Sequence, residues 1–254
     1  MILDDIIKMT QLRIREPEER GGETASTKPE GCNFVCSGQH AVIAEIKFSS
    51  PSAGRIRERT DPGQIAVAYR KGGCAAISVL TEPAYFGGGR PEDIAAVKNA
   101  VPPLPVLRKD FIIDLRQIAE TRFLGADAVL LIAGLLGERL GGEFVSAAYA
   151  AELEPLVEVH TSAEVALALA SDAEMIGINN RDLCTMQLQP ETTAALAQPI
   201  RDAGRIVVSM SGIGGGTGGY PAARPPVCRC LPCRDSLMSA EDPPQTVLEE
   251  FVCA

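Results

Sequence analysis

Charged and amide side chains follow several short apolar runs of the chain, at positions where groups that move protons or bind anions are expected. The residues concerned are Glu45, Lys47, Lys109, Glu158, Asn179 and Arg181. Lysine and glutamate side chains that share one site set each other's pKa values, which suits proton transfer near neutral pH. For any one of them, the competing interpretation is an ion pair that only stabilises the fold. Such side chains at four separate strand ends favour a catalytic site.

The segment from Leu104 to Leu136 indicates how these residues are positioned. A strand-like run, Leu104–Leu107, ends in three charged residues, and a second buried strand is expected at Ala128–Ile132. Between them we predict a helix that begins after the N-cap Asp114. Its buried face should consist of Leu115, Ile118, Ala119 and Phe123. Strand, helix and strand form one βαβ unit, whose strands are parallel. The charged strand end then faces the functional side of a parallel α/β sheet or barrel.

The same unit repeats along the chain. Buried strands are expected at Ala41–Ile46, Ala75–Leu80, Leu104–Leu107, Ala128–Ile132, Glu154–Val159, Glu174–Ile178 and Arg205–Met210. Helix starts are indicated by Asp61-Pro62 and by the capping-box spacing of Thr161 and Glu164. Seven βα units in one chain of 254 residues favour a (β/α)₈ TIM barrel of the α/β class over an open sheet.

The eighth strand of this barrel is atypical or missing. It is due near residue 230, but the prolines at 221, 225, 226 and 232 and the six glycines from 212 to 219 oppose a buried parallel strand. At best, Val227 to Leu231 pairs weakly. We therefore treat residues 214–234 as an anomalous stretch, and hypothesise a compensated pair of frameshifts in the coding DNA. If neither of the other two reading frames encodes a Val/Leu-rich strand ending in Gly, this hypothesis fails.

Two regions are predicted from these patterns: residues 1–40 and a barrel at 41–254. In the first, residues 2–16 should form an amphipathic helix, and residues 17–40 an irregular loop. The apolar face of the helix should consist of Ile2, Leu3, Ile6, Ile7 and Met9. A last helix is expected to begin at Asp242-Pro243.

Composition restricts the classes of function. The net charge of −9 argues against a nucleic-acid partner. The longest apolar run is too short to span a bilayer, and the N-terminus lacks the pattern of a signal peptide. We expect a cytoplasmic protein without a membrane partner, whose eight cysteines are reduced thiols.

Two weaker patterns concern a phosphate and a metal. Ser211 and Gly212 follow a late strand, where backbone N–H groups of barrel enzymes often bind phosphate. The glycines at 214–219 are better explained as a loop. Cys228, Cys230 and Cys233 lack a fourth zinc ligand at suitable spacing, so no metal is expected. His160 faces the same way as Glu158 in a strand, and we expect a loop residue or one that acts only through a neighbour.

Longer motifs carry a resemblance to a known family. They read IAEIKFSSPSAG, ISVLTEPAYFGGG, PVLRKDFIIDLRQIAETRFLGADAVLLIAGLL, LEPLVEVHTSAE and IGINNRDLCTM. Over residues 41–213, and again at 2–16 and 236–252, the chain resembles indole-3-glycerol phosphate synthase of tryptophan biosynthesis.

The resemblance implies a cofactor-free carboxy-lyase of aromatic amino acid biosynthesis, with a phosphorylated small molecule as substrate. It would convert 1-(2-carboxyphenylamino)-1-deoxyribulose 5-phosphate to indole-3-glycerol phosphate, with loss of CO₂ and water. The implied catalytic residues are Lys109 as general acid, Glu158 in the dehydration, and Lys47, which contacts the substrate carboxylate and shares the acid role, with Glu45 tuning it. The implied binding residues are Asn179, Arg181, Ser50, Phe111 and Leu183 for the substrate, and Ser211 and Gly212 for the phosphate. We expect a monomer or a weak homo-oligomer.

Three departures from the family pattern support an alternative. The family's SESGI motif reads SMSGI here, so Met210 replaces a carboxylate; Arg234 and Asp235 precede Ser236 where a glycine is expected; and residues 17–40 lack the expected cover of the pocket. The alternative is an impaired or inactive barrel of the same family. A third candidate, phosphoribosylanthranilate isomerase, is disfavoured because no cysteine–aspartate pair stands at the required strand ends.

Overall fold

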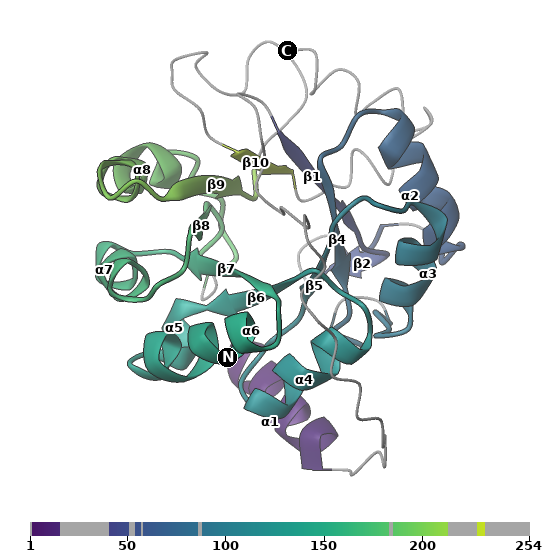
Figure 1. The fold of residues 1–254 in the computed structure, drawn as a ribbon, viewed down its shortest axis with the longest axis horizontal. Coiled ribbons are helices and arrows are strands. Elements are labelled where there is room, and N and C mark those ends of the chain that lie inside the picture. The colour runs from purple at the N-terminus through teal and green to yellow at the C-terminus, as the bar shows by residue number, and fades with distance from the viewer. Residues whose placement is uncertain are drawn as a thin grey trace.

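A closed barrel of parallel strands forms the centre of the molecule (Figure 1). The computed structural model describes residues 2–15, 41–50, 54–56, 58–85, 88–182, 185–212 and 228–231. The barrel strands within these ranges are β1 (Val42–Ile46), β4 (Ala76–Leu80), β5 (Val106–Lys109), β6 (Ala128–Ile132), β7 (Glu154–Val159), β8 (Met175–Asn179), β9 (Ile206–Met210) and β10 (Cys228–Leu231). Each pairs in parallel with its neighbours, in the order β1-β10-β9-β8-β7-β6-β5-β4. The predicted TIM barrel is confirmed.

Helices surround the strands in Figure 1, as the repeated βα units require. They are α2 (Pro62–Lys71), α3 (Asp93–Ala100), α4 (Leu115–Phe123), α5 (Ala133–Leu136), the π-helical turn η1 (Leu140–Val145), α6 (Ser146–Ala150), α7 (Ser162–Ala170) and α8 (Thr192–Asp202). The side chains of Asp61, Asp114 and Thr161 cap α2, α4 and α7 as predicted. A short hairpin of β2 (Ser49–Ser50) and β3 (Gly54–Arg55) follows β1.

The eighth barrel strand is present, although it is short. β10 spans four residues, and it pairs with β1 through Arg229 opposite Val42 and with β9 through Arg229 opposite Ser209. The prediction of an atypical strand at Val227–Leu231 therefore agrees with the structure, and the possibility that the strand is missing is wrong. The rest of the anomalous stretch, the loop at 17–40 and the helix at Asp242 lie outside the described residues.

Alternation along the strands divides the aliphatic core into an inner and an outer layer. The inner cluster contains one residue in two from the strands, including Ile43, Leu107, Leu130 and Leu156. The intervening residues pack outward against the helices in two further clusters. Burial on both faces is the expected result of a parallel barrel wrapped by helices.

The N-terminal helix α1 (Ile2–Arg15) lies against the barrel with a narrower apolar face than predicted. Ile6 is buried and, with Leu3, packs against the inner cluster beside Phe111 and Tyr85, which follow strands β5 and β4. Met9, predicted on the same face, is 47% exposed. Thus α1 covers part of the end of the barrel at which the strands finish.

The buried face of α4 differs from the prediction. Ile118 is buried, but Leu115 and Phe123 are 41% and 57% exposed, and Ala119 is exposed too. Gln117 and Thr121 take their place facing the barrel. Both contact a buried arginine of β5, so polar partners in the barrel wall, rather than apolar periodicity, fix the rotation of this helix. None of the helices described is long and apolar enough to cross a membrane.

Candidate active site at the carboxyl end of the barrel

The strand alternation places the predicted polar residues inside the barrel. Glu45 follows the inner residue Ile43 by two positions and Lys47 follows by four, while Lys109 follows the inner residue Leu107 by two. Glu158 follows Leu156 by two positions, and Asn179 follows Gly177 by two. Residues two apart on a strand share a face. All five therefore belong to the inner layer at the carboxyl end, as predicted.

Glu45 lies between two lysines. Its Oε1 is 3.0 Å from Lys47 Nζ, and its Oε2 is 3.6 Å from Lys109 Nζ. Burial raises the pKa of Glu45, but the charges of Lys47 and Lys109 outweigh it, and the net shift is downward. The carboxylate therefore stays ionised and holds two ammonium groups, from β5 and from the end of β1, in one place.

Glu158 is the second buried carboxylate, with 2% exposure. Its Oε1 accepts a hydrogen bond of 3.0 Å from Asn179 Nδ2 and lies 3.4 Å from His160 Nε2. Burial alone raises its pKa, but His160, Lys109 and Asn179 lower it to about 2. Glu158 also acts on the pKa of Glu45 by charge repulsion. Lys109, Glu158 and Glu45 therefore share one electrostatic environment.

The predicted substrate-binding residues lie around this centre with different degrees of constraint. Asn179 accepts the backbone N–H of Arg181 at 3.0 Å, and the Arg181 guanidinium donates to the carbonyl oxygen of Met186 at 2.8 Å. Ser50 is buried in the hairpin after β1, and Phe111 belongs to the inner cluster. Leu183 lies outside the described residues.

The predicted phosphate-binding residues have an unusual backbone. Ser211 and Gly212 have φ angles of 62° and 77°, both in the left-handed region. Asn180 supports this turn because its Nδ2 donates to the carbonyl oxygens of Met210 and Ser211, each at 3.0 Å. Asn180 Oδ1 in turn accepts from Thr193 at the start of α8. A strained turn held by a buried amide is typical of a functional loop, and no pattern in the sequence indicated this role for Asn180.

Met210 lies inside the barrel rather than at its surface. It is 2% exposed, belongs to the inner cluster, and stands opposite Asn179 in the strand register. Its sulfur lies so close to Gly177 that an added Cβ there would be 2.5 Å away. The thioether therefore occupies the inner wall beside the amide that holds Glu158, where a carboxylate is expected from the family motif.

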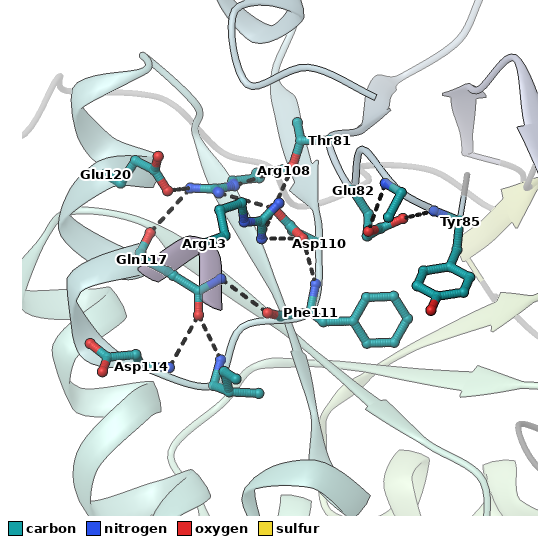
Figure 2. Close-up of polar contacts among 12 residues, drawn as sticks. Arg13, Thr81, Glu82, Tyr85, Arg108, Asp110, Phe111, Asp114, Gln117 and Glu120 are labelled. Atoms are coloured by element: carbon teal, nitrogen blue, oxygen red, sulfur yellow. Dashed lines mark hydrogen bonds and ion pairs between the residues drawn. The ribbon is translucent and has the colours of Figure 1, made fainter. Parts of the chain in front are cut away.

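A buried ion network supports the end of β5, which carries Lys109, and the loop after it, which carries Phe111 (Figure 2). Arg108 points outward from β5 and donates to Asp110 Oδ2 at 3.0 Å, to Thr121 Oγ1 at 3.1 Å and to the Gln117 carbonyl at 3.3 Å. Figure 2 shows Asp110 in contact with Arg108 and with Arg13, a residue of α1 that donates to both carboxylate oxygens at 3.0 and 3.1 Å.

This network was not predicted from the sequence. There, Arg108 and Asp110 were identified only as two of the three charged residues at the end of a strand. Alternation from Leu107 already indicates that Arg108 and Lys109 face opposite sides of the strand. The partner on α1 is 97 residues distant from Asp110 and has no local signal. Burial raises the pKa of Asp110, but Arg108 and Arg13 outweigh it and lower that pKa.

The arrangement is suited to acid–base chemistry on an anionic substrate. Two ammonium groups can donate protons or bind a carboxylate, and an ionised glutamate can accept a proton, within one partly dry chamber. Among the described residues, no cluster of three or more His, Cys, Asp or Glu side chains is arranged to hold a metal ion. Cys233, one of the three cysteines considered for a zinc site, lies outside those residues.

Comparison with known proteins gives a consistent result. The family model for indole-3-glycerol phosphate synthase matches residues 30–246. An indole-3-glycerol phosphate synthase of Carboxydothermus hydrogenoformans is 50% identical over 176 residues, which cover 69% of this chain and 66% of the relative, just under two thirds of its length. The enzyme of Acetivibrio thermocellus is 41% identical over 224 residues, covering 84% of this chain and 85% of the relative.

Solved structures with much lower identity share the fold. A crystal structure of KGPDC from Streptococcus mutans has a TM-score of 0.65 at 13% identity, covering 84% of this chain and 96% of that chain. A 3-hexulose-6-phosphate synthase has a TM-score of 0.61 at 16% identity, covering 84% of this chain and 98% of that chain. At such identity the likeness shows the barrel alone.

Proposed function

The chain belongs to the indole-3-glycerol phosphate synthase family, and we propose that its barrel closes the indole ring of 1-(2-carboxyphenylamino)-1-deoxyribulose 5-phosphate. Family membership implies a carboxy-lyase of tryptophan biosynthesis that takes a phosphorylated small molecule. The observation that carries the proposal at residue level is the pairing of Glu45 with both Lys47 and Lys109 beside the ionised Glu158.

In ring closure, the aromatic carbon that bears the carboxylate attacks the ketone carbon of the substrate. Negative charge then develops on the ketone oxygen, and an ammonium group in the chamber supplies the proton that neutralises it. Lys109 takes this role in the proposal, while Lys47 contacts the substrate carboxylate and shares the acid role. Loss of CO₂ returns its bonding electrons to the ring and restores aromaticity.

Dehydration completes the reaction. The hydroxyl formed from the ketone leaves as water with a proton from a lysine ammonium, and the neighbouring methylene carbon loses a proton. Glu158 is the proposed acceptor, since its pKa near 2 keeps it ionised before the reaction. Asn179 and Arg181 orient the substrate, Ser50, Phe111 and Leu183 line the pocket, and Ser211 and Gly212 bind the phosphate.

One assay tests the proposal. The purified protein is mixed with the carboxyphenylamino-deoxyribulose phosphate, and indole formation is followed by ultraviolet absorbance. Product formation supports the synthase. Tight binding without turnover supports the alternative, a catalytically impaired or inactive barrel, which is favoured by the burial of Met210 where the family has a glutamate. No binding and no turnover contradict both. A cytoplasmic location and a monomeric or weakly oligomeric state are part of the same proposal.

A further inference from the structure

His160 lies between two carboxylates at the end of β7. Its Nε2 is 3.4 Å from Glu158 Oε1, and its Nδ1 is 3.3 Å from Glu164 Oε2. The reaction proposed above assigns no role to either His160 or Glu164. An imidazole that contacts a carboxylate through each nitrogen is fixed in its orientation and favoured in its charged form.

Glu164 is itself held firmly. Its Oε2 accepts the backbone N–H of His160 at 2.7 Å, and its own backbone N–H is capped by Thr161 at the start of α7. Gly134 of α5 approaches from the other side, since a Cβ there would lie 3.1 Å from Glu164 Oε1. The carboxylate thus cannot turn away without leaving a backbone donor unpaired.

The two oxygens of Glu158 have different surroundings. Asn179 Nδ2 and His160 Nε2 both approach Oε1. Oε2 is buried and has no hydrogen-bond partner among the described residues. His160 Nε2 also makes no hydrogen bond there, so its contact with Oε1 at 3.4 Å is an ion pair. A buried carboxylate oxygen without a partner is costly, which favours a partner that arrives with the substrate.

The charges around this group come from several elements. Lys109 of β5 and Glu45 of β1 act on Glu158, and Glu164 of α7 acts on His160. Burial lowers the pKa of His160, but Glu158 and Glu164 outweigh it and raise the pKa to about 10. His160 therefore carries a positive charge at neutral pH, next to the oxygen that Asn179 also holds.

We propose that His160, held by Glu164, is a positioning residue that fixes Glu158 through Oε1, so that Oε2 faces the substrate and accepts its proton. The inference rests on the proposed function, since it concerns the dehydration step. The methylene C–H bond breaks and its electrons form the ring double bond. The hydroxyl leaves as water with a lysine proton, and Glu158 Oε2 takes the carbon's proton.

The first test is kinetic and uses the His160→Gln and Glu164→Gln variants, with Glu143→Gln as a matched control. Glu143 is exposed, pairs with Arg139 in the contacts described, and is not among the residues assigned to the chamber. We expect His160→Gln to lower kcat by about tenfold with little change in KM. The acid limb of its pH–rate profile should move to higher pH, because Glu158 loses a cation. Glu164→Gln should also lower kcat and move the acid limb of the pH–rate profile to higher pH, but by smaller amounts.

The second test does not need turnover. The imidazole nitrogens of His160 in the wild-type protein are followed by ¹⁵N NMR against pH. The inference is supported if His160 titrates near pH 10 in the wild-type protein and at a lower pH in Glu164→Gln. It is overturned if His160 of the wild-type protein titrates near pH 6.5. Unchanged kcat and pH profile in a folded His160→Gln variant overturn it as well. If the wild-type protein forms no product, the proposed function fails, and the titration still decides whether His160 is paired as inferred.

Discussion

At the scale of single residues, the two ion pairs of Glu45, with Lys47 and with Lys109, are the feature of the site that mutation tests most directly. Each carboxylate oxygen faces a different ammonium group, from the end of β1 and from β5. If either lysine is removed, the other lysine still has Glu45 as its carboxylate partner. The fold should tolerate such a change better than the reaction does, because Glu45 keeps a counter-charge.

Lys109→Ala should abolish measurable turnover, a loss of about a hundredfold or more, since the acid that neutralises the ketone oxygen is removed. The circular dichroism spectrum and the melting temperature should stay close to those of the wild-type protein. Lys71→Ala, at the exposed end of α2, serves as the control. Appreciable turnover by Lys109→Ala would overturn the acid assignment.

Met210→Glu should raise turnover, by about tenfold, because it returns a carboxylate to the inner wall opposite Asn179. It should also lower the free energy of unfolding by about 2 kcal/mol, since the new group is buried among apolar side chains. Met210→Gln, similar in size but uncharged, should lose stability without the gain in rate. Equal rates for the two variants would show that the missing carboxylate is not what limits the reaction.

At the scale of elements, the loop between β5 and α4 is held by buried ion pairs in addition to the apolar packing of Phe111 and Ile112. Arg108 is fully buried and contacts Thr81 just after β4, Thr121 of α4 and Asp110 just after its own strand. Asp110 adds α1 through Arg13. The position of Lys109, one residue before Asp110, therefore depends on the same network that attaches the N-terminal helix.

Asp110→Asn should lower the free energy of unfolding by about 3 kcal/mol, because the buried Arg108 then keeps only the partly exposed carboxylate of Glu120, 2.7 Å away, as a counter-charge, and Arg13 loses its carboxylate partner. Asp114→Asn is the matched control: it also converts an aspartate in this loop, but asparagine caps helices about as well, so the loss should stay below about 0.5 kcal/mol. Urea unfolding measures both. Similar losses in the two variants would contradict the structural role of Asp110.

At the scale of the whole molecule, closure of the barrel depends on the four residues of β10. Arg229→Pro should lower the free energy of unfolding by about 3 kcal/mol, since proline breaks the ladder of a strand paired on both sides. Arg229→Ala keeps the backbone donor and should lose less than about 1 kcal/mol. Chemical unfolding followed by circular dichroism compares them. Tolerance of proline at 229 would mean that the barrel does not need this strand.

The pH dependence of stability also belongs to the whole molecule. The pKa of Glu158 falls from 4.5 to about 2 on folding, so its contribution is present above pH 4.5 and is lost as the pH falls towards 2. The pKa of His160 rises from 6.5 to about 10, so its contribution is present below pH 6.5 and is lost as the pH rises through 10.

Stability should therefore be greatest between pH 4.5 and 6.5 and should decline on both sides. Urea unfolding across this range measures the profile. His160→Gln should flatten the alkaline decline, while Glu143→Gln should leave it unchanged. A stability that rises from pH 6.5 to 9 would contradict the charged state assigned to His160.

Local patterns along the chain were enough to predict the barrel and the position of most residues of the candidate site. Strand bounds, helix caps and the inward direction of Lys109 and Glu158 follow from alternation and local hydrogen bonding, which act over a few residues. The prolines and glycines near β10 correctly indicated an atypical strand. The further possibility that the strand is missing was wrong, because pairing with β1 and β9 compensates for the poor strand preference of this sequence.

Three features became known only from the folded molecule: which face of α4 is buried, how α1 is attached, and which oxygen of Glu158 is held. Each depends on a contact between distant parts of the chain: Arg108 with Thr121, Arg13 with Asp110, and Asn179 with Glu158. Hydrophobic periodicity records where apolar groups are hidden. Hydrophobic periodicity does not indicate which polar side chains will be buried together. Here the hydrogen bonds and charges of those side chains outweigh the apolar pattern and fix the geometry of the site.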